Sequence, residues 1–262
     1  MLQGKTAVVY GAGGHVGGAV ARAFAREGAS VYLAGRTLAG LEAVAEEVRA
    51  AGGTAETAQV DALDKRAVEG HLGAVVERAG RLDVSFNAVS IRGDLQGTPL
   101  LELSAEDFAT PVLTGVRTHF LTATAAARRM AAQGSGVVLT LSSSSSALSG
   151  RDRRFHRTGG FSTACAAVEA FSRSLAGEVG PQGVRVVCLR PDALPESWGE
   201  YGEVEGGSRH KGEVWRYMES GTALGRLPTL AEVADAAVFA ASDRAGALTG
   251  TVLNLSCGSV ME

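Results

Sequence analysis

Residues 9–18 read Val-Tyr-Gly-Ala-Gly-Gly-His-Val-Gly-Gly, and this glycine-rich stretch decides the fold. It follows an apolar, β-branched run from Thr6 to Tyr10 and precedes a helical pattern from Val16 to Glu27. Glycines between a strand and a helix permit a tight turn and let backbone N–H groups approach a pyrophosphate at the helix N-terminus. The stretch therefore predicts a dinucleotide-binding loop that opens a βαβ unit. A tight turn without a ligand is the alternative.

The rest of the chain continues this alternation of apolar strand runs and Ala-rich helical stretches. Continuous apolar strands, as opposed to alternating ones, are typical of a parallel sheet covered on both faces. The sequence therefore predicts one α/β domain over 1–262, a Rossmann-type doubly wound parallel sheet with helices on both faces. The expected strands are Thr6–Tyr10, Val31–Ala34, Ala55–Val60, Val84–Asn87, Gly136–Leu141, Val184–Leu189 and Thr251–Leu255, and the expected helices are Val16–Glu27, Leu38–Ala50, Ala67–Ala79, Gly115–Ala132, Phe161–Val179 and Ala231–Ala241.

Composition limits which binding partners and which cellular compartments we expect for this protein. A net charge of -3 over 262 residues argues against a nucleic-acid or anionic-membrane surface. No apolar run approaches the ~20 residues that span a bilayer, and the chain enters a strand pattern at once, which leaves no room for a signal peptide. Cys165, Cys188 and Cys257 form no CxxC pair, so we expect reduced interior thiols in a cytoplasmic protein without a metal site.

The second expected strand ends in Gly35-Arg36-Thr37, where the adenosine ribose of a bound dinucleotide would lie. A carboxylate at this place would accept bonds from a ribose 2′-hydroxyl but would repel a 2′-phosphate. Arg36 instead offers a guanidinium fork that suits a phosphate. We therefore predict NADP as the cofactor in preference to NAD. A solvated arginine on a loop is the alternative.

Three segments interrupt the strand–helix rhythm. Ser142 to Ser146 is a run of five serines at a strand end, and Arg151 to Arg157 is a short basic insertion. Residues 194–221 are long, polar and Gly/Glu-rich, which predicts an irregular substrate lid. The arginines suggest an anionic substrate or carrier, such as a CoA or acyl-carrier phosphate. A solvated charged loop explains the insertion equally well.

Taken together, these residues resemble the short-chain dehydrogenase/reductase family over essentially the whole chain. The family's TGxxxGxG loop is matched by residues 10–17, with Tyr10 for its Thr and His15 for its middle Gly. Further matches are Asp61 (the adenine contact), Asn87-Ala88-Val89-Ser90 (NNAG), Leu141-Ser142-Ser143 (the strand end with the catalytic Ser) and Arg190-Pro191-Asp192 (the PG turn). The resemblance implies a small-molecule substrate, a homo-oligomer (dimer or tetramer), and cofactor contacts from Gly11, Gly13, Gly14, His15, Val16, Gly17, Arg36, Asp61, Ala62, Asn87, Ala88 and Pro191.

The family's catalytic Tyr-x-x-x-Lys pair is absent. Phe161 stands at the Tyr position, Cys165 at the Lys position and Gly115 near the position of the catalytic Asn, so that only Ser143 remains of the usual four groups. A shift of register cannot restore the pair, because the chain has no Lys between Lys65 and Lys211 and no Tyr between Tyr32 and Tyr201. General acid–base catalysis typically raises a reaction rate by ~10²–10⁴-fold, so we expect ordinary ketone reduction to be slowed by a factor of this order.

Four side chains are candidates to replace the missing groups. Tyr201 and Tyr217 lie in the expected lid, His156 lies in the basic insertion, and Cys165 lies one helical turn beyond Phe161. Apolar lid anchors, a solvated loop histidine and a packed thiol are the simpler interpretations. Three functions stay open: an atypical NADP(H)-dependent oxidoreductase on a carbonyl, enoyl or hydroxy substrate, a non-redox isomerase, dehydratase or cyclase, and a cofactor-binding pseudoenzyme.

Overall fold

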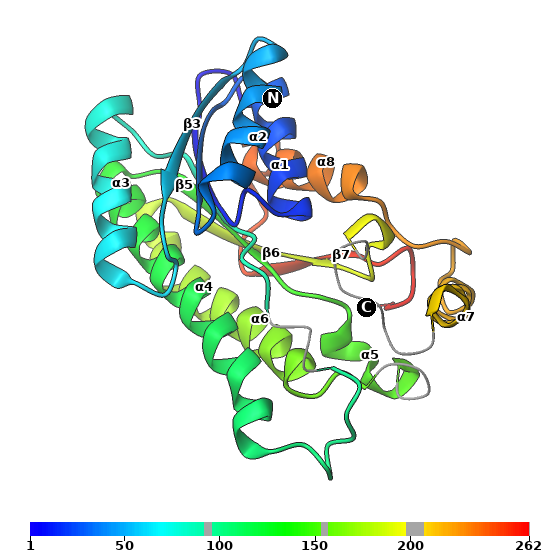
Figure 1. The fold of residues 1–262 in the computed structure, drawn as a ribbon. Coiled ribbons are helices and arrows are strands. Elements are labelled where there is room, and N and C mark those ends of the chain that lie inside the picture. Colours follow the sequence, from blue (N-terminus) through cyan, green and yellow to red (C-terminus); the bar gives the residue numbers. More distant parts are fainter. Residues whose placement is uncertain (92–95, 153–156, 198–206, 262) are drawn as a thin grey trace.

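Strands and helices alternate along the chain as the sequence predicts (Figure 1). The computed structural model describes residues 1–91, 96–152, 157–197 and 207–261. The strands are β1 (Thr6–Tyr10), β2 (Ser30–Gly35), β3 (Thr54–Gln59), β4 (Val84–Asn87), β5 (Gly136–Leu141), β6 (Val184–Pro191) and β7 (Thr251–Leu255). The helices are α1 (His15–Arg26), α2 (Leu38–Ala50), α3 (Lys65–Ala79), α4 (Ala105–Gln133), α5 (Ser145–Asp152), α6 (Gly160–Val179), α7 (Gly207–Ser220) and α8 (Leu230–Ala241), with 3₁₀ turns η1 (Gly180–Gln182), η2 (Pro195–Ser197) and η3 (Asp243–Ala245).

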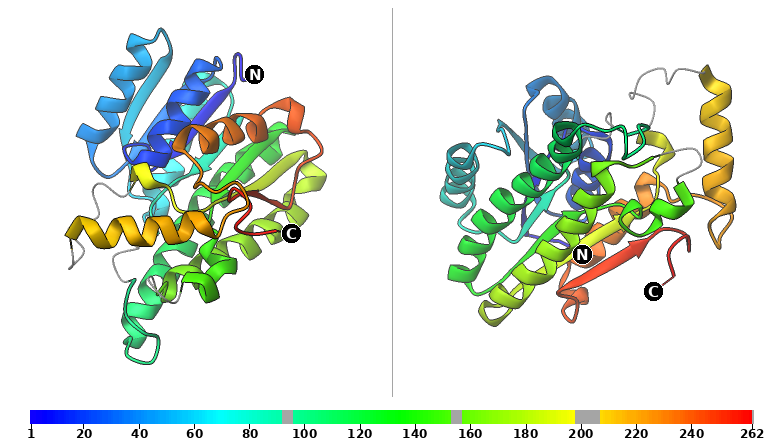
Figure 2. Two further views of the ribbon diagram at one scale, coloured as in Figure 1. Left: turned by 90° about the vertical axis from the view of Figure 1, so that its right-hand side faces the viewer. Right: turned by 90° about the horizontal axis from the view of Figure 1, so that it is seen from below.

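The seven strands form one parallel sheet in the order β3-β2-β1-β4-β5-β6-β7. Helices α1, α2 and α8 cover one face, and α3, α4 and α6 cover the other (Figure 2). The predicted doubly wound fold is therefore confirmed. The strand order reverses between β1 and β4, and in open parallel sheets the crevice at that reversal is where ligands bind.

Each face of the sheet has its own hydrophobic core. Val9, Phe24 and Leu33 belong to the core under α1 and α2, whereas Val8, Leu72 and Met130 belong to the core under α3 and α4. Alternate residues of β1 therefore enter opposite cores, as strand geometry requires. This arrangement explains why the central strands read as unbroken apolar runs. Within the described ranges, no helix is both long enough and apolar enough to cross a membrane.

Two expectations about the elements were incomplete. The long helix begins at Ala105, well before Gly115, because Ser104 caps it by accepting a hydrogen bond from the Asp107 N–H at 3.0 Å. The segment 194–221 is not irregular throughout, since it holds η2 and the helix α7. Helix α5 was not predicted, because a run of serines carries no helical hydrophobic pattern.

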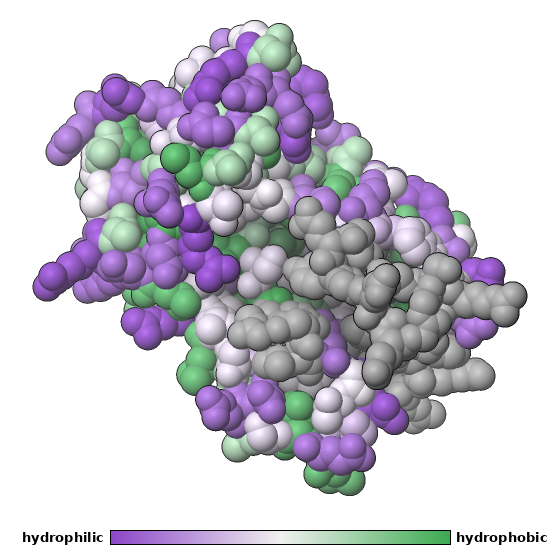
Figure 3. Space-filling view, viewed as in Figure 1, coloured by the Kyte–Doolittle hydropathy of each residue, from purple (hydrophilic) through white to green (hydrophobic). Residues whose placement is uncertain are grey.

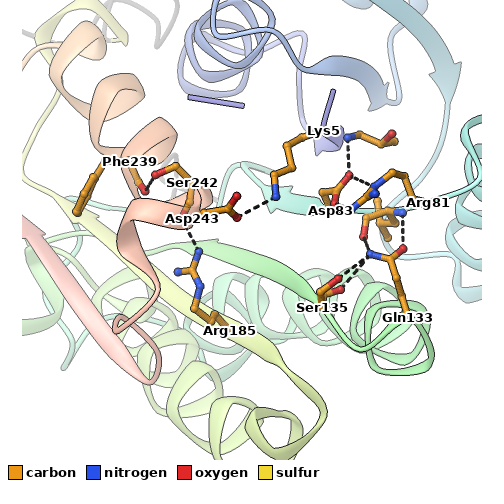
Figure 4. A network of polar contacts seen from close by, with 11 residues as sticks. Lys5, Arg81, Asp83, Gln133, Ser135, Arg185, Phe239, Ser242 and Asp243 are labelled. Atoms are coloured by element: carbon orange, nitrogen blue, oxygen red, sulfur yellow. Dashed lines mark hydrogen bonds and ion pairs between the residues drawn. The ribbon is translucent and has the colours of Figure 1, made fainter. Parts of the chain in front are cut away.

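The edge of the sheet opposite the carboxyl ends is joined by a polar network (Figure 4). The buried Asp83 carboxylate accepts hydrogen bonds from the Thr6 N–H at 2.8 Å and from Arg81 Nε at 2.8 Å. Lys5 Nζ lies 2.9 Å from the exposed Asp243 carboxylate. The Asp83 contacts join the starts of β1 and β4, the two strands that flank the reversal.

We expect Asp83→Ala to lower the free energy of unfolding by about 3 kcal/mol, because it removes a buried carboxylate and leaves the Thr6 N–H without its acceptor. Urea denaturation measures the loss. The matched control is Asp243→Ala, which breaks an exposed ion pair worth less than about 1 kcal/mol. Equal losses in the two variants would contradict the central place given to Asp83.

Candidate functional site

The turn between β1 and α1 is a close contact of backbone on backbone. Gly11 has φ +74°, and a Cβ added there would lie 2.7 Å from the Ala88 carbonyl oxygen. A Cβ at Gly17 would lie 2.3 Å from the Gly11 carbonyl oxygen. Any side chain at either position would therefore have to displace main chain. The two glycines let the end of β1 and the start of α1 pack directly on the end of β4.

This packing places the N-terminus of α1 at the reversal of strand order. The helix begins at His15, its N-cap residue Gly14 provides no side-chain cap, and its first turn holds no acidic residue. The first N–H groups of a helix have no carbonyl partner within it and carry partial positive charge. A pyrophosphate fits such a terminus. His15 is half-buried and its Nε2 atom is shielded from solvent.

The residues expected to hold the adenosine half lie at the carboxyl ends of β2 and β3. The Gln59 side chain donates to the Arg36 carbonyl at 2.9 Å, which fixes the Arg36 backbone while its side chain stays exposed. Asp61 is also exposed, and its Oδ1 accepts from the Leu63 N–H at 2.9 Å. Ala62 beside it is buried. In the part of the chain that the structure describes, the Arg36 guanidinium has no carboxylate partner.

The Asn87 side chain belongs to the scaffold of the site. It is buried, and it donates from Nδ2 to Thr122 Oγ1 on α4 and accepts at Oδ1 from the Val89 N–H, both at 2.9 Å. The Ala88 N–H donates to the Tyr10 carbonyl at 2.9 Å. These bonds hold the end of β4 against β1 and α4. Asn87 therefore shapes the crevice, and the backbone of Ala88 is what borders Gly11.

The residues at the Tyr and Lys positions lie on α6. Phe161 is half-buried and carries no exchangeable proton. Cys165 is buried, and burial raises the pKa of its thiol, which favours the protonated thiol over the nucleophilic thiolate. Cys188 is likewise buried and Cys257 is half-buried, and none of the three forms a disulfide. The structure supports the packed-thiol interpretation of Cys165.

The place of the catalytic Asn is closed as well. A Cβ on Gly115 would lie 3.0 Å from Ile91 Cγ1, so an asparagine would fit only if Ile91 moved. The Gly115 carbonyl already accepts from Thr118 Oγ1 at 3.0 Å and from His119 Nδ1 at 2.9 Å. The carbonyl at this position is therefore satisfied by the chain itself.

His119 is a residue of this site that the sequence analysis missed. It is fully buried on α4, and its Nε2 faces the Leu141 N–H at 3.4 Å while its Nδ1 bonds to Gly115. A neutral ring that donates from Nδ1 and accepts at Nε2 satisfies both contacts. Burial lowers the pKa of His119 to about 4. Its signal in the sequence was its place four residues, about one helical turn, beyond Gly115.

The remaining candidates are only partly brought together. Ser143 is half-buried at the end of β5, with its hydroxyl 3.4 Å from that of Ser145. Tyr217 is half-buried on α7. His156 and Tyr201 lie outside the described residues, as do Arg153 and Arg154 of the basic insertion. The four substitutes for the catalytic pair therefore stay predictions, apart from the buried thiol of Cys165.

The surface around the site is mixed in polarity. Near the middle of the view in Figure 3, neutral and apolar surface lies between hydrophilic side chains. A pocket of about 310 Å³ lies between η2, α7 and the start of α8, and its lining includes Trp215 and Glu219. Across the described ranges, no group of three or more His, Cys, Asp or Glu side chains is placed to hold a metal ion.

Comparison with known proteins decides the family. The family model described as enoyl-(acyl carrier protein) reductase matches residues 11–259. The chain belongs to the short-chain dehydrogenase/reductase family.

It is 34% identical to an uncharacterised oxidoreductase of Mycobacterium tuberculosis over 98% of this chain and 92% of that protein. It is 33% identical to an L-rhamnose 1-dehydrogenase (NAD(P)+) of Azotobacter vinelandii over 98% and 97% of the two chains. A solved short-chain dehydrogenase/reductase of Mycobacterium marinum superposes with a TM-score of 0.86 at 27% identity, over 100% of this chain and 97% of that one. Members of this family are oxidoreductases that use a nicotinamide cofactor.

We expect Gly17→Ala to weaken binding of the family's nicotinamide cofactor by at least about tenfold, because the new Cβ would push Gly11 and the α1 N-terminus apart. Fluorescence titration of the purified variant measures the affinity. Gly70→Ala is the control, since it adds a Cβ in a helix with no atom within 4 Å. Undiminished binding by Gly17→Ala would show that the close contact does not shape the site.

His119 should make stability depend on pH. Its pKa is about 4 when folded against an ordinary value of 6.5, so the unfolded chain takes up the proton first as the pH falls. Stability present above pH 6.5 is then lost towards pH 4, by up to about 1.4 kcal/mol per pH unit from this residue. We expect His119→Gln to flatten that slope in urea unfolding between pH 7 and 5.

Partial burial lowers the pKa of the half-buried His71 to about 4 too, so His71→Gln should also flatten this slope. The double variant should show the sum of the two effects. An unchanged slope in all three variants would show that neither ring is held neutral by the fold.

Proposed function

We propose that this chain is an NADP(H)-dependent oxidoreductase that acts on a small carbonyl, enoyl or hydroxy substrate without the family's Tyr/Lys pair. The observation that carries the proposal is the glycine contact between Gly11, Gly17 and the end of β4, which leaves the α1 N-terminus open to a pyrophosphate. The N–H groups of His15, Val16 and Gly17 would hold that group. Gly13 and Gly14 complete the loop.

The preference for NADP rests on Arg36. Its exposed guanidinium at the end of β2 would bind the 2′-phosphate, while Asp61 and Ala62 would border the adenine. The similar rhamnose dehydrogenase is named for both NAD and NADP, which is compatible with either cofactor. Ala88 and Pro191, at the ends of β4 and β6, would border the nicotinamide half.

An enoyl substrate suits this site better than a simple ketone. Reduction of a ketone creates an alkoxide, which needs an acid in place, and Phe161 and Cys165 supply none. Addition of hydride to an enoyl group conjugated to a carbonyl creates an enolate, which water can protonate. The match to the enoyl-(acyl carrier protein) reductase model supports this substrate class. Ser143 would orient the carbonyl oxygen from the end of β5.

A homo-oligomer, a cytoplasmic location and a substrate lid at 194–221 are part of the same proposal. Leu113 and Phe120 are exposed on one face of α4, at 67% and 51%, and Phe120 lies beside Phe171 of α6. An apolar patch on the two longest helices supports association through that face.

A second candidate is a non-redox enzyme or a cofactor-binding pseudoenzyme on the same scaffold. The closed Gly115 position and the neutral, buried Cys165 favour it, because together they remove the family's proton relay. Turnover of enoyl thioesters with a fall in NADPH absorbance supports the oxidoreductase. Product without a change in absorbance, or cofactor binding without any product, supports the second candidate.

We expect the protein to bind NADPH about 10- to 100-fold more tightly than NADH, and Arg36→Ala to erase the difference by weakening NADPH alone. Calorimetric titration of both cofactors against both proteins measures this. The matched control is Arg244→Ala, which removes an exposed arginine within η3 and should keep the preference. Equal affinity of the parent protein for the two cofactors would refute the role of Arg36.

A further inference from the structure

A pocket of about 550 Å³ lies between the edge strand β3 and the helix α3. Helix α3 packs closely on α4 but stands off β3, and this leaves space at the edge of the sheet (Figure 1). Pockets of this size are typical of sites that hold small molecules. The lining residues that matter for the argument are Tyr32, Glu56, Ala58, His71, Val75 and Arg78.

The pocket lies away from the crevice where the strand order reverses. Helix α3 runs back from the carboxyl end of β3 to the amino end of β4, so its second half lies toward the amino ends of the strands. The helix residues of the pocket, from His71 to Arg78, belong almost entirely to that half. A molecule in the pocket would leave the N-terminus of α1 free. The inference drawn from it therefore does not depend on the proposed function.

Two polar atoms beside the pocket are left without a hydrogen bond. His71 Nδ1 and the Tyr10 hydroxyl are both shielded from solvent, and neither has a partner among the residues that the structure describes. The half-buried His71 lines the pocket, and the ring of the fully buried Tyr10 packs edge-on against it, with 6.0 Å between the centroids. Buried polar groups in proteins are almost always paired, so these atoms indicate a partner that the chain itself does not supply.

The chemistry of the lining favours a ligand without charge. Burial lowers the pKa of His71 to about 4, so its ring is neutral and offers one donor and one acceptor nitrogen. Burial also raises the pKa of Tyr32, and the Glu56 carboxylate adds to the rise, so the phenol keeps its proton. Glu56 and Arg78 form an ion pair with each other. Glu77 is exposed to solvent, which screens its charge.

The remaining walls of the pocket are apolar. Tyr32 and Val75 belong to the hydrophobic core on this face of the sheet, and Ala58 packs against that core. The small side chains of Ala58 and Ala74 leave the space between strand and helix open. A flat aromatic ring buries much apolar area in such a space, while a few polar groups fix its orientation.

We propose that this pocket is a second binding site of the protein, for a small uncharged aromatic molecule that carries a hydroxyl group. The ring lies between Ala58 of β3 and Val75 of α3. The hydroxyl donates to a nitrogen of His71 and accepts from the Tyr32 phenol. The site is separate from the cofactor crevice, so both can be filled at once.

The test is a titration of the ¹⁵N-labelled full chain with p-cresol, followed through the amide signals. Binding should be saturable, with a Kd on the order of 1 mM, and the signals of His71, Ala74 and Val75 should change most. Toluene, which lacks the hydroxyl, is the matched probe. Hydrophobic burial alone would favour toluene, because water solvates p-cresol better. The two hydrogen bonds should nevertheless make p-cresol bind at least about fivefold more tightly.

Three variants locate the site. Ala58→Phe fills the pocket and should abolish binding of p-cresol. Ala43→Phe is the control, because it adds the same ring at an exposed position of α2, on the other face of the sheet, and it should keep the affinity. His71→Phe retains a ring but removes both nitrogens, so it should lower the preference for p-cresol over toluene by at least about threefold.

The result on the parent protein alone can overturn the inference. It is overturned if p-cresol causes no saturable change in the α3 signals, if the changes centre on Gly13 to Gly17, or if toluene binds as tightly. A folded Ala58→Phe protein that still binds p-cresol overturns it as well. Saturating NADP+ should alter the p-cresol affinity by less than about twofold, since the two sites share no contact. Failure of NADP+ to bind contradicts the proposed function alone.

Discussion

The structure depends on one close approach of main chain to main chain. Gly11 lies against the Ala88 carbonyl and Gly17 against the Gly11 carbonyl, at distances that admit no Cβ. This contact fixes where α1 begins. It also points the N-terminus of α1 toward the crevice where the strand order reverses. The buried Asp83 supports it from the far end of β1 and β4. The expected cofactor contacts lie around this junction, at the carboxyl ends of the central strands.

Around that junction the glycine loop follows the family's pattern, whereas Phe161, Cys165 and Gly115 stand at the positions where the resemblance places the catalytic Tyr, Lys and Asn. Two of these positions, Cys165 and Gly115, are closed by packing. Cys165 is buried, and Ile91 fills the space beside Gly115. The Gly115 carbonyl oxygen accepts a hydrogen bond from His119 Nδ1. A half-buried phenylalanine and a buried thiol therefore stand where the resemblance places a tyrosine and a charged lysine. Neither Phe161 nor the buried Cys165 thiol supplies a proton or a fixed positive charge there.

Local sequence signals predicted most of the fold, including the turn from β1 to α1. Gly11 to Gly17 lie close together in the chain, so the turn and the helix that follows it can be inferred from their spacing, and the ligand of the loop stays a prediction. The rest depends on contacts between distant residues. The sequence near Ser142 does not indicate that its hydroxyl donates a hydrogen bond to Glu169. The sequence near Gly115 does not show that Ile91 fills the space beside Gly115. Helix α5 and the early start of α4 were missed because caps and tertiary packing, not hydrophobic period, define them.

The most direct test of this account is an NMR titration of ¹⁵N-labelled protein with NADP+. A pyrophosphate on the α1 N-terminus should perturb the amide signals of Gly13 to Gly17 most, with those of Arg36 and Asp61 next. The starts of β1 and β4, at the opposite edge, should hardly change. Saturable binding that leaves the Gly13 to Gly17 amides unmoved would contradict the account, because the glycine junction would then have no part in holding the cofactor.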